Sequence, residues 1–221
     1  MRTGIVLLAI PLLLLPVAAR AQWRAGVTGG AAYNVFSMDR QYMTDYRLEG
    51  RWGASAGVVC QYDFNDWLAV RADLNWTQKN YRKHRMVLKD MDYHYRNDYL
   101  QLPVTASFSF GGEKLRGFCN LGVYAGLWLG SHRAGSDYNN FGGYAYAFSE
   151  QVAFDPEVDQ RWDFGPAGGL GVQYRIASHW AVMLEARYYY SLVSTVKQYM
   201  RVQDYRYNTT AAIQLGVQYI F

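Results

Sequence analysis

The chain ends in a run of strict alternation, and this run constrains the fold more than any other feature. Odd positions from Ala211 to Phe221 hold only Ala, Ile, Leu, Val, Tyr and Phe, whereas Gln214, Gly216 and Gln218 lie between them. Successive side chains of a β-strand point to opposite faces, so one face here is apolar and the other largely polar. The pattern predicts a strand that lies between lipid and a packed polar interior. A core strand of a soluble protein is the alternative.

The N-terminus predicts export from the cytoplasm. Arg2 precedes an apolar run from Gly4 to Leu15, and Ala19-Arg20-Ala21 forms an Ala-x-Ala cleavage site. We therefore expect residues 1–21 to be a cleaved signal peptide and residues 22–221 to form the outer-membrane domain. Cleavage leaves 20 Lys and Arg against 18 Asp and Glu, a formal charge of +2. This near-neutral balance gives no sign of nucleic-acid binding.

The exported part divides into eight alternating segments. Three short connections interleave with four long ones, and the long ones span residues 36–50, 82–92, 131–160 and 194–208. This layout predicts an all-β fold, a single eight-stranded antiparallel up-and-down transmembrane β-barrel. The alternation at Tyr144, Tyr146 and Phe148 inside the third long loop leaves a ten-stranded barrel open. A secreted β-sandwich is the competing class.

Large aromatic residues mark the two ends of the apolar faces. Nine or ten residues at about 3.3 Å each, tilted by about 40°, match the height of an apolar membrane band. We expect two aromatic girdles, formed by Trp67, Trp76, Trp162, Tyr174, Trp180 and Tyr190.

Charged residues on the polar faces predict an ion network inside the barrel. Arg71 and Asp73 lie about as far from their short turn as Glu185 and Arg187 lie from theirs. An eight-stranded barrel is just wide enough for side chains to fill, and isolated buried charges are costly. We expect these four residues to pair across the lumen, joined by Gln101 or Gln214, and to plug it. A gate or proton path is the alternative.

Other candidate sites are fewer. Lys79, Arg82, Lys83 and Arg85 lie on the second long loop and its stems, where phosphates of lipopolysaccharide would lie. A solvated loop explains the same cluster. We expect no catalytic residues, no metal site and no cofactor, because neither a nucleophile motif nor metal-ligand spacing is present.

Two motifs carry a family resemblance. Gln214, Gly216, Tyr219 and Phe221 resemble the C-terminal signal by which the barrel-assembly machinery recognises its clients. Asn97-Asp98-Tyr99-Leu100-Gln101-Leu102-Pro103-Val104 resembles the Tyr-Leu-x-x-Pro signature of the PorT-like outer-membrane β-barrel family of Bacteroidetes. The resemblance implies one barrel in the outer membrane, with termini and short turns in the periplasm and long loops outside the cell.

The function that we expect is non-enzymatic, either structural or in surface interactions. Its expected partners are outer-membrane lipid, lipopolysaccharide and, during biogenesis, the barrel-assembly machinery; no protein partner outside the cell is identified. A narrow porin, an accessory of a secretion system and a barrel enzyme acting on lipids remain alternatives.

Overall fold

The computed structural model describes residues 22–38, 45–87, 91–139, 141–197 and 205–221. The expected signal peptide, residues 1–21, lies outside the described residues. One antiparallel sheet contains all ten strands: β1 (Gln22–Met38), β2 (Tyr46–Asp63), β3 (Leu68–Gln78), β4 (Tyr81–Arg85), β5 (Asp92–Gly111), β6 (Leu115–Asn139), β7 (Tyr144–Val152), β8 (Trp162–Arg175), β9 (Trp180–Tyr190) and β10 (Arg206–Ile220).

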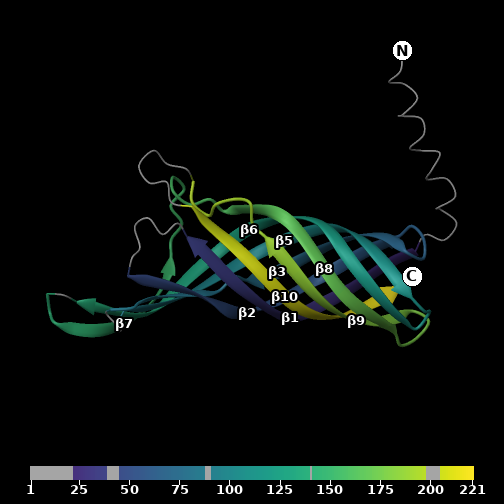
Figure 1. The fold of residues 1–221 in the computed structure, drawn as a ribbon, viewed down its shortest axis with the longest axis horizontal. Helices are drawn as coiled ribbons and strands as arrows, with labels where there is room; N and C mark the ends of the chain where they lie inside the picture. Colours follow the sequence, from purple (N-terminus) through teal and green to yellow (C-terminus); the bar gives the residue numbers. More distant parts are fainter. Residues whose placement is uncertain (1–21, 39–44, 88–90, 140, 198–204) are drawn as a thin grey trace, which may run out of the picture.

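Eight of these strands close into a ring. The order around it is β1, β2, β3, β5, β6, β8, β9 and β10, and β10 pairs with β1 from Arg24↔Ile220 to Met38↔Arg206. Figure 1 shows these strands tilted around a common axis, with the C-terminus at the end that carries the short turns. Closure pairs the backbone groups that a sheet edge would leave open to lipid.

The two remaining strands, β4 and β7, are not members of this ring. β4 continues the line of β3 after a break at Lys79 and Asn80, and it pairs with β2 and β5. β7 pairs with β6 alone among the described strands. The expected eight-stranded barrel is confirmed; the segment around Tyr146 is a strand, as its alternation suggested, but it does not enlarge the ring to ten.

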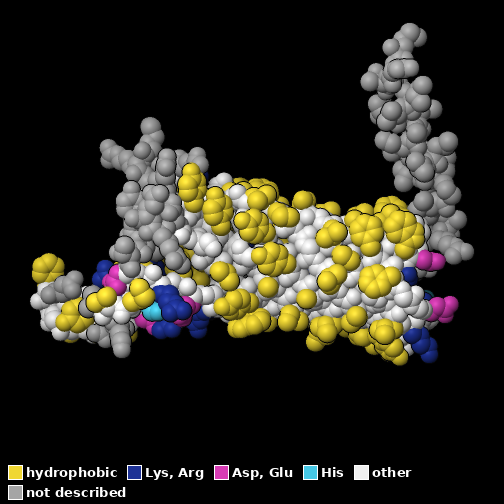
Figure 2. Space-filling view, viewed as in Figure 1, with side chains coloured by type: hydrophobic (Ala, Val, Ile, Leu, Met, Phe, Trp, Pro, Cys, Tyr) yellow, Lys and Arg dark blue, Asp and Glu magenta, His cyan; other side chains and the backbone are white. Residues whose placement is uncertain are grey.

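Burial is the reverse of that in a soluble protein. Lumen-facing positions are buried and mostly polar, such as Asn34, Gln101 and Glu185, whereas Val27, Leu121 and Leu215 are exposed on the outer surface. In Figure 2 the hydrophobic side chains cover the barrel wall, and charged side chains gather at its two ends. No helix among the described residues is long and apolar enough to cross a membrane.

Two residues show how the ring tolerates its tight geometry. The β3–β5 register runs from Leu68↔Phe108 to Ala72↔Val104 and resumes only at Asn75↔Gln101. Pro103 lies in this gap, because proline has no N–H to give to the ladder. At Gly30 a Cβ atom would lie 1.9 Å from the carbonyl oxygen of Ile213, so only glycine allows β1 and β10 to approach this closely.

Beyond the outer girdle, half of the ring continues as a sheet. Tyr46–Gly50 of β2 pairs with β4, β4 pairs with residues 92–95 of β5, and residues 131–139 of β6 bridge β5 and β7. Figure 1 shows β7 at the tip of this extension, far from the short turns. Parts of three segments expected to be long loops are thus extended strands, because pairing with neighbours continues after the lipid-facing alternation has ended.

Candidate functional site

Four charged residues form a closed ring of ion pairs in the middle of the lumen. Arg71 Nε lies 2.9 Å from Asp73 Oδ1, and Arg71 Nη1 lies 3.1 Å from Glu185 Oε2. Arg187 Nε lies 2.7 Å from Glu185 Oε1, and Arg187 Nη1 also contacts Asp73 Oδ2. β3 carries the first two residues and β9 the other two, and three ring strands separate β3 from β9 on either side. The quartet therefore braces opposite walls of the barrel.

The amide partners of the quartet differ from those that the sequence suggested. Asn120 on β6 donates from Nδ2 to Glu185 Oε1 at 2.7 Å. Gln214 is the cross-strand neighbour of Glu185, but its Nε2 donates to Ser55 Oγ at 2.9 Å. Gln101 on β5 is fully buried, and neither its Oε1 nor its Nε2 has a hydrogen-bond partner among the described residues. Asn120 also lies on an inward face by alternation. Sequence spacing alone does not show that Asn120, rather than Gln101 or Gln214, contacts Glu185.

A second ion pair lies nearer the outer mouth. Lys79 Nζ is 2.5 Å from Asp163 Oδ2, and the hydroxyls of Tyr124 and Ser191 donate to Asp163 Oδ1 at 3.0 and 2.6 Å. The ammonium also lies 4.7 Å from the centre of the Tyr99 ring. Lys79 is 0% exposed. The expectation that Lys79 contacts lipopolysaccharide is therefore wrong, because Lys79 continues the inward series of Asn75 and Thr77 just before the strand breaks.

A third charged layer fills the end with the short turns. Arg24 Nε lies 2.5 Å from Asp63 Oδ2, and Arg24 Nη1 donates to Gln173 Oε1 at 2.9 Å. Gln61 Nε2 donates to Asp63 Oδ1 at 2.7 Å. The sequence alone does not show this pair, because Arg24 and Asp63 lie almost 40 residues apart and only the β1–β2 register brings the two together.

These layers leave little free space inside the barrel. Between the third layer and the quartet, the gap lined by Gln61, Arg71, Gln173 and Met183 has no room for a water molecule. All four quartet residues are buried, as are Lys79 and Asp163. The geometry is that of a lumen filled by its own side chains rather than an open pore.

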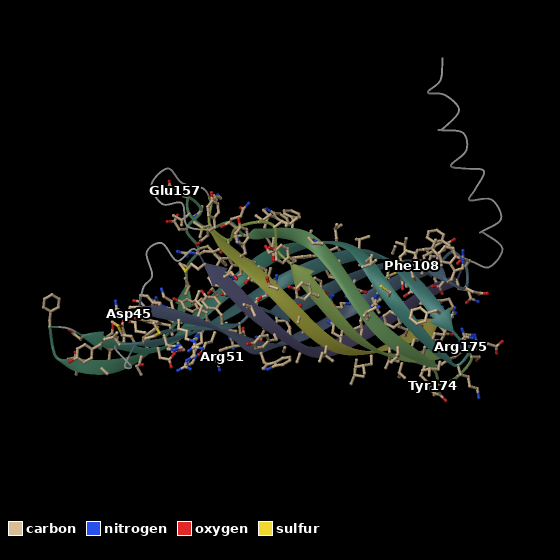
Figure 3. All side chains as sticks on the ribbon, in the orientation of Figure 1. Asp45, Arg51, Phe108, Glu157, Tyr174 and Arg175 are labelled. Atoms are coloured by element: carbon tan, nitrogen blue, oxygen red, sulfur yellow. The ribbon has the colours of Figure 1, made fainter. Side chains whose placement is uncertain are left out.

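The predicted girdle residues lie on the outer surface at both ends of the wall. Trp67, Tyr174 and Trp180 are exposed near the short turns, and Trp76, Trp162 and Tyr190 are exposed near the opposite end. Figure 3 labels Tyr174 and Phe108 at the first of these ends. Amphipathic rings at two levels are typical of outer-membrane barrels.

The C-terminal residues also divide between the two faces. Gln214 is buried in the lumen, whereas Phe221 is exposed. The Tyr219 ring lies 5.2 Å from that of Trp180 and 5.0 Å from that of Phe221. In the folded barrel Tyr219 and Phe221 are therefore part of the girdle near the short turns, and Gly216 faces Thr28 across the β1–β10 pair.

Three cations of the predicted lipopolysaccharide cluster lie on the extension, and they do not share one environment. Arg82 donates to both carboxylate oxygens of Asp92, at 2.8 and 2.7 Å, and lies 3.3 Å from Glu49. Lys83 and Arg85 instead lie over the ring of Tyr46, at 4.2 and 4.9 Å from its centre. Alternation along β4 separates Arg82 from Lys83 and Arg85, so the cluster is split between two faces.

Arg51 and His94 lie on the same face as Arg82. Arg51 Nη1 is 2.7 Å from His94 Nδ1. Because a guanidinium can only donate, His94 accepts with Nδ1 and is neutral. Burial lowers the pKa of His94; Asp92 raises it, and Arg51 and Arg82 lower it further. The sequence alone gives no sign that Arg51 belongs to a site, because Gly50 and Trp52 flank it and no other cation lies next to it.

Two open hollows lie on the extension. One of about 410 Å³ lies at the barrel mouth and is lined by residues such as Tyr95, Trp128, Arg133 and Glu150. The other, of about 530 Å³, lies at the β6–β7 tip beside Tyr138, Phe141, Tyr144 and Tyr146. The described residues contain no group of three or more His, Cys, Asp or Glu placed to hold a metal ion.

Comparison with known proteins agrees with this geometry. The family model described as "Outer membrane protein beta-barrel domain" matches residues 18–197. OprG from Pseudomonas aeruginosa superposes with a TM-score of 0.54 at 15% identity, over 90% of this chain and 95% of that one. The outer membrane protease OmpT from Escherichia coli gives 0.51 at 10% identity, over 90% and 97%. Comparison with curated protein sequences finds no match. The structural likenesses show the fold, and the family match places the barrel in the bacterial outer membrane.

Proposed function

Since the chain belongs to the outer membrane protein β-barrel domain family, we propose that it is a closed, non-enzymatic barrel that acts through the sheet projecting outside the cell. The observation that carries this proposal is β7, a complete strand that lies beyond the ring and has β6 as its one described neighbour. A barrel with a purely structural role has no need of such a strand. The three charged layers support the other half of the proposal, because they fill the lumen.

The edge of β7 that points away from β6 has no partner among the described strands, and this free edge is suited to an extended polypeptide. An edge strand presents a row of backbone donors and acceptors, and proteins usually protect it with lysine, proline or a bulge. β7 has the sequence Tyr-Ala-Tyr-Ala-Phe-Ser-Glu-Gln-Val, without lysine or proline, and the side chain of its single charge, Glu150, is bound by Arg133. Ala145 and Ala147 alternate with exposed Tyr144 and Tyr146, so one face of β7 carries small side chains and the other offers aromatic contacts. We infer that a partner protein adds a strand here.

Lysines in place of Ala145 and Ala147, on the face of β7 that carries small side chains, are expected to block this interaction. A photo-crosslinking residue at position 146 in cells should give a discrete adduct with the partner. In A145K/A147K the yield is expected to fall about tenfold, which corresponds to about 1.4 kcal/mol of lost binding. The uncharged variant A145S/A147S should keep the wild-type yield. Equal adduct yields in the lysine and serine variants would argue against the edge as the binding site.

The closed lumen is tested separately by conductance. Purified barrel in a planar bilayer is expected to give no stable unitary current steps, because its charged layers are paired across the lumen. The control is the same preparation shown to be folded by its shifted mobility on unheated SDS gels. Reproducible steps from folded protein would favour the narrow porin over the closed barrel.

The resemblance to the PorT-like family, and with it a role in a secretion system, rests on the motif around Tyr99 and Pro103. Both residues are buried, and the hydroxyl of Tyr99 accepts from Asn208 Nδ2 at 3.3 Å. Tyr99 and Pro103 thus help to fill the lumen, whereas Leu102 and Val104 of the same motif are exposed on the lipid-facing wall. We therefore favour surface interaction over the accessory role, and we retain Tyr219 and Phe221 as the proposed contact with the barrel-assembly machinery during biogenesis.

A further inference from the structure

The outward face of the projecting sheet carries positive charge directly beyond the outer girdle. Arg51 follows Gly50 and precedes Trp52, which is exposed on the lipid-facing wall. Arg96 is exposed on β5, two residues after His94, whose ring contacts Arg51. Figure 3 labels Arg51 where the barrel wall passes into the extension, and Figure 2 shows Lys and Arg side chains gathered there beside a histidine. These residues lie at the level where the headgroups of the outer leaflet begin.

The charge of Arg51 and Arg96 is not matched by carboxylates. On the same face Arg82 forms ion pairs with both Asp92 and Glu49. Asp98 accepts a hydrogen bond from Gln78 at 3.3 Å. Arg51 contacts His94, whose Nε2 lies 3.7 Å from Asp92 Oδ2, and neither Arg51 nor Arg96 makes an ion pair within the part of the chain that the structure describes. Two guanidinium groups on this face thus have no carboxylate partner among the described residues and can bind an anion.

His94 relates the positions of the two arginines on this face. His94 and Arg96 are two positions apart on one strand, about 6.6 Å at about 3.3 Å per residue. The contact of Arg51 with His94 brings the second guanidinium to the same side of the sheet. Arginine binds phosphate through paired N–H groups, and its charge persists at any physiological pH.

We propose that Arg51 and Arg96 form a binding site for the phosphorylated headgroup of lipopolysaccharide in the outer leaflet. The site differs from the cluster that the sequence suggested: it excludes Lys79, which is buried, and Lys83 and Arg85, which lie over Tyr46. It does not depend on the free edge of β7, so either proposal can fail without the other. Bound lipid would anchor the extension at the membrane surface, next to Trp52.

The test compares two variants that lose the same formal charge. In R51Q/R96Q the proposed site is removed; in K114Q/R175Q two cations are removed at the opposite end of the barrel, where Figure 3 labels Arg175. Folded barrel in detergent is titrated with bisphosphorylated lipid A and with dephosphorylated lipid A. R51Q/R96Q is expected to bind the phosphorylated lipid about tenfold more weakly than wild type, equivalent to about 1.4 kcal/mol. K114Q/R175Q should bind as wild type does.

Three outcomes would overturn the site. The first is equal binding of phosphorylated lipid A by wild type and R51Q/R96Q. The second is equal binding of both lipids by wild type. The third is displacement of lipid A by equimolar inorganic phosphate, which would identify a site for free phosphate rather than for the headgroup. Heat-dependent gel mobility of both variants ensures that folded proteins are compared.

Discussion

Replacement of Glu185 by alanine is expected to lower the free energy of unfolding by about 3–5 kcal/mol, the usual cost of removing one partner from a buried ion pair. Glu185 is 0% exposed and lies between Arg71 and Arg187, at 3.1 and 2.7 Å. Without its carboxylate, two guanidinium groups share the single carboxylate of Asp73, and Asn120 loses its acceptor. Urea unfolding in lipid vesicles, followed by tryptophan fluorescence, measures the loss.

Glu113 provides the control for this substitution. It is exposed in the turn between β5 and β6, so E113Q should leave the unfolding midpoint unchanged. A second variant, R71Q/E185Q, removes one positive and one negative charge and keeps the Arg187–Asp73 pair. We expect it to be less destabilised than the sum of its single variants, because neighbours in one network are not additive. If E185Q unfolds like wild type and conducts ions, the quartet is a gate rather than a structural plug.

The quartet could be predicted from the sequence because two regularities were enough. Alternation placed Arg71, Asp73, Glu185 and Arg187 on inward faces, and counting from the short turns placed them at one height. The structure brings these four together. The same counting could not find the Arg24–Asp63 layer, because these residues lie near strand ends, where the register of β1 against β2 decides which charges meet.

The extension was harder to predict, since lipid no longer sets the pattern there. Residues 131–139 look like a polar loop in sequence, yet they continue β6 because β5 and β7 pair with them on either side. Lys79 was misplaced for a related reason. Lys79 is close in sequence to the cationic run from Arg82 to Arg85. The break between β3 and β4 separates them, so residues that are close in sequence do not lie on the same face.

Loss of Asp163 is expected to have the second large effect on stability, again about 3–5 kcal/mol in D163A. Asp163 is the anion beside Lys79, which is fully buried against the rings of Tyr99 and Tyr124. Its carboxylate also accepts from the hydroxyls of Tyr124 and Ser191. Alanine leaves the ammonium without its counter-charge and both hydroxyls without their acceptor. The measurement is the same vesicle unfolding experiment.

Rescue by a second substitution separates the buried charge from a general packing defect. In K79M/D163N methionine keeps the length of the lysine stem, and asparagine keeps an oxygen that can accept from Tyr124 and Ser191. Replacing a buried ion pair by neutral groups of similar size is often close to neutral for stability. We therefore expect this double variant to regain most of the stability that D163A loses. Were K79M/D163N as unstable as D163A, the loss in D163A would come from disturbed packing around position 163 and not from an unpaired ammonium, which would contradict the role of the Lys79–Asp163 pair.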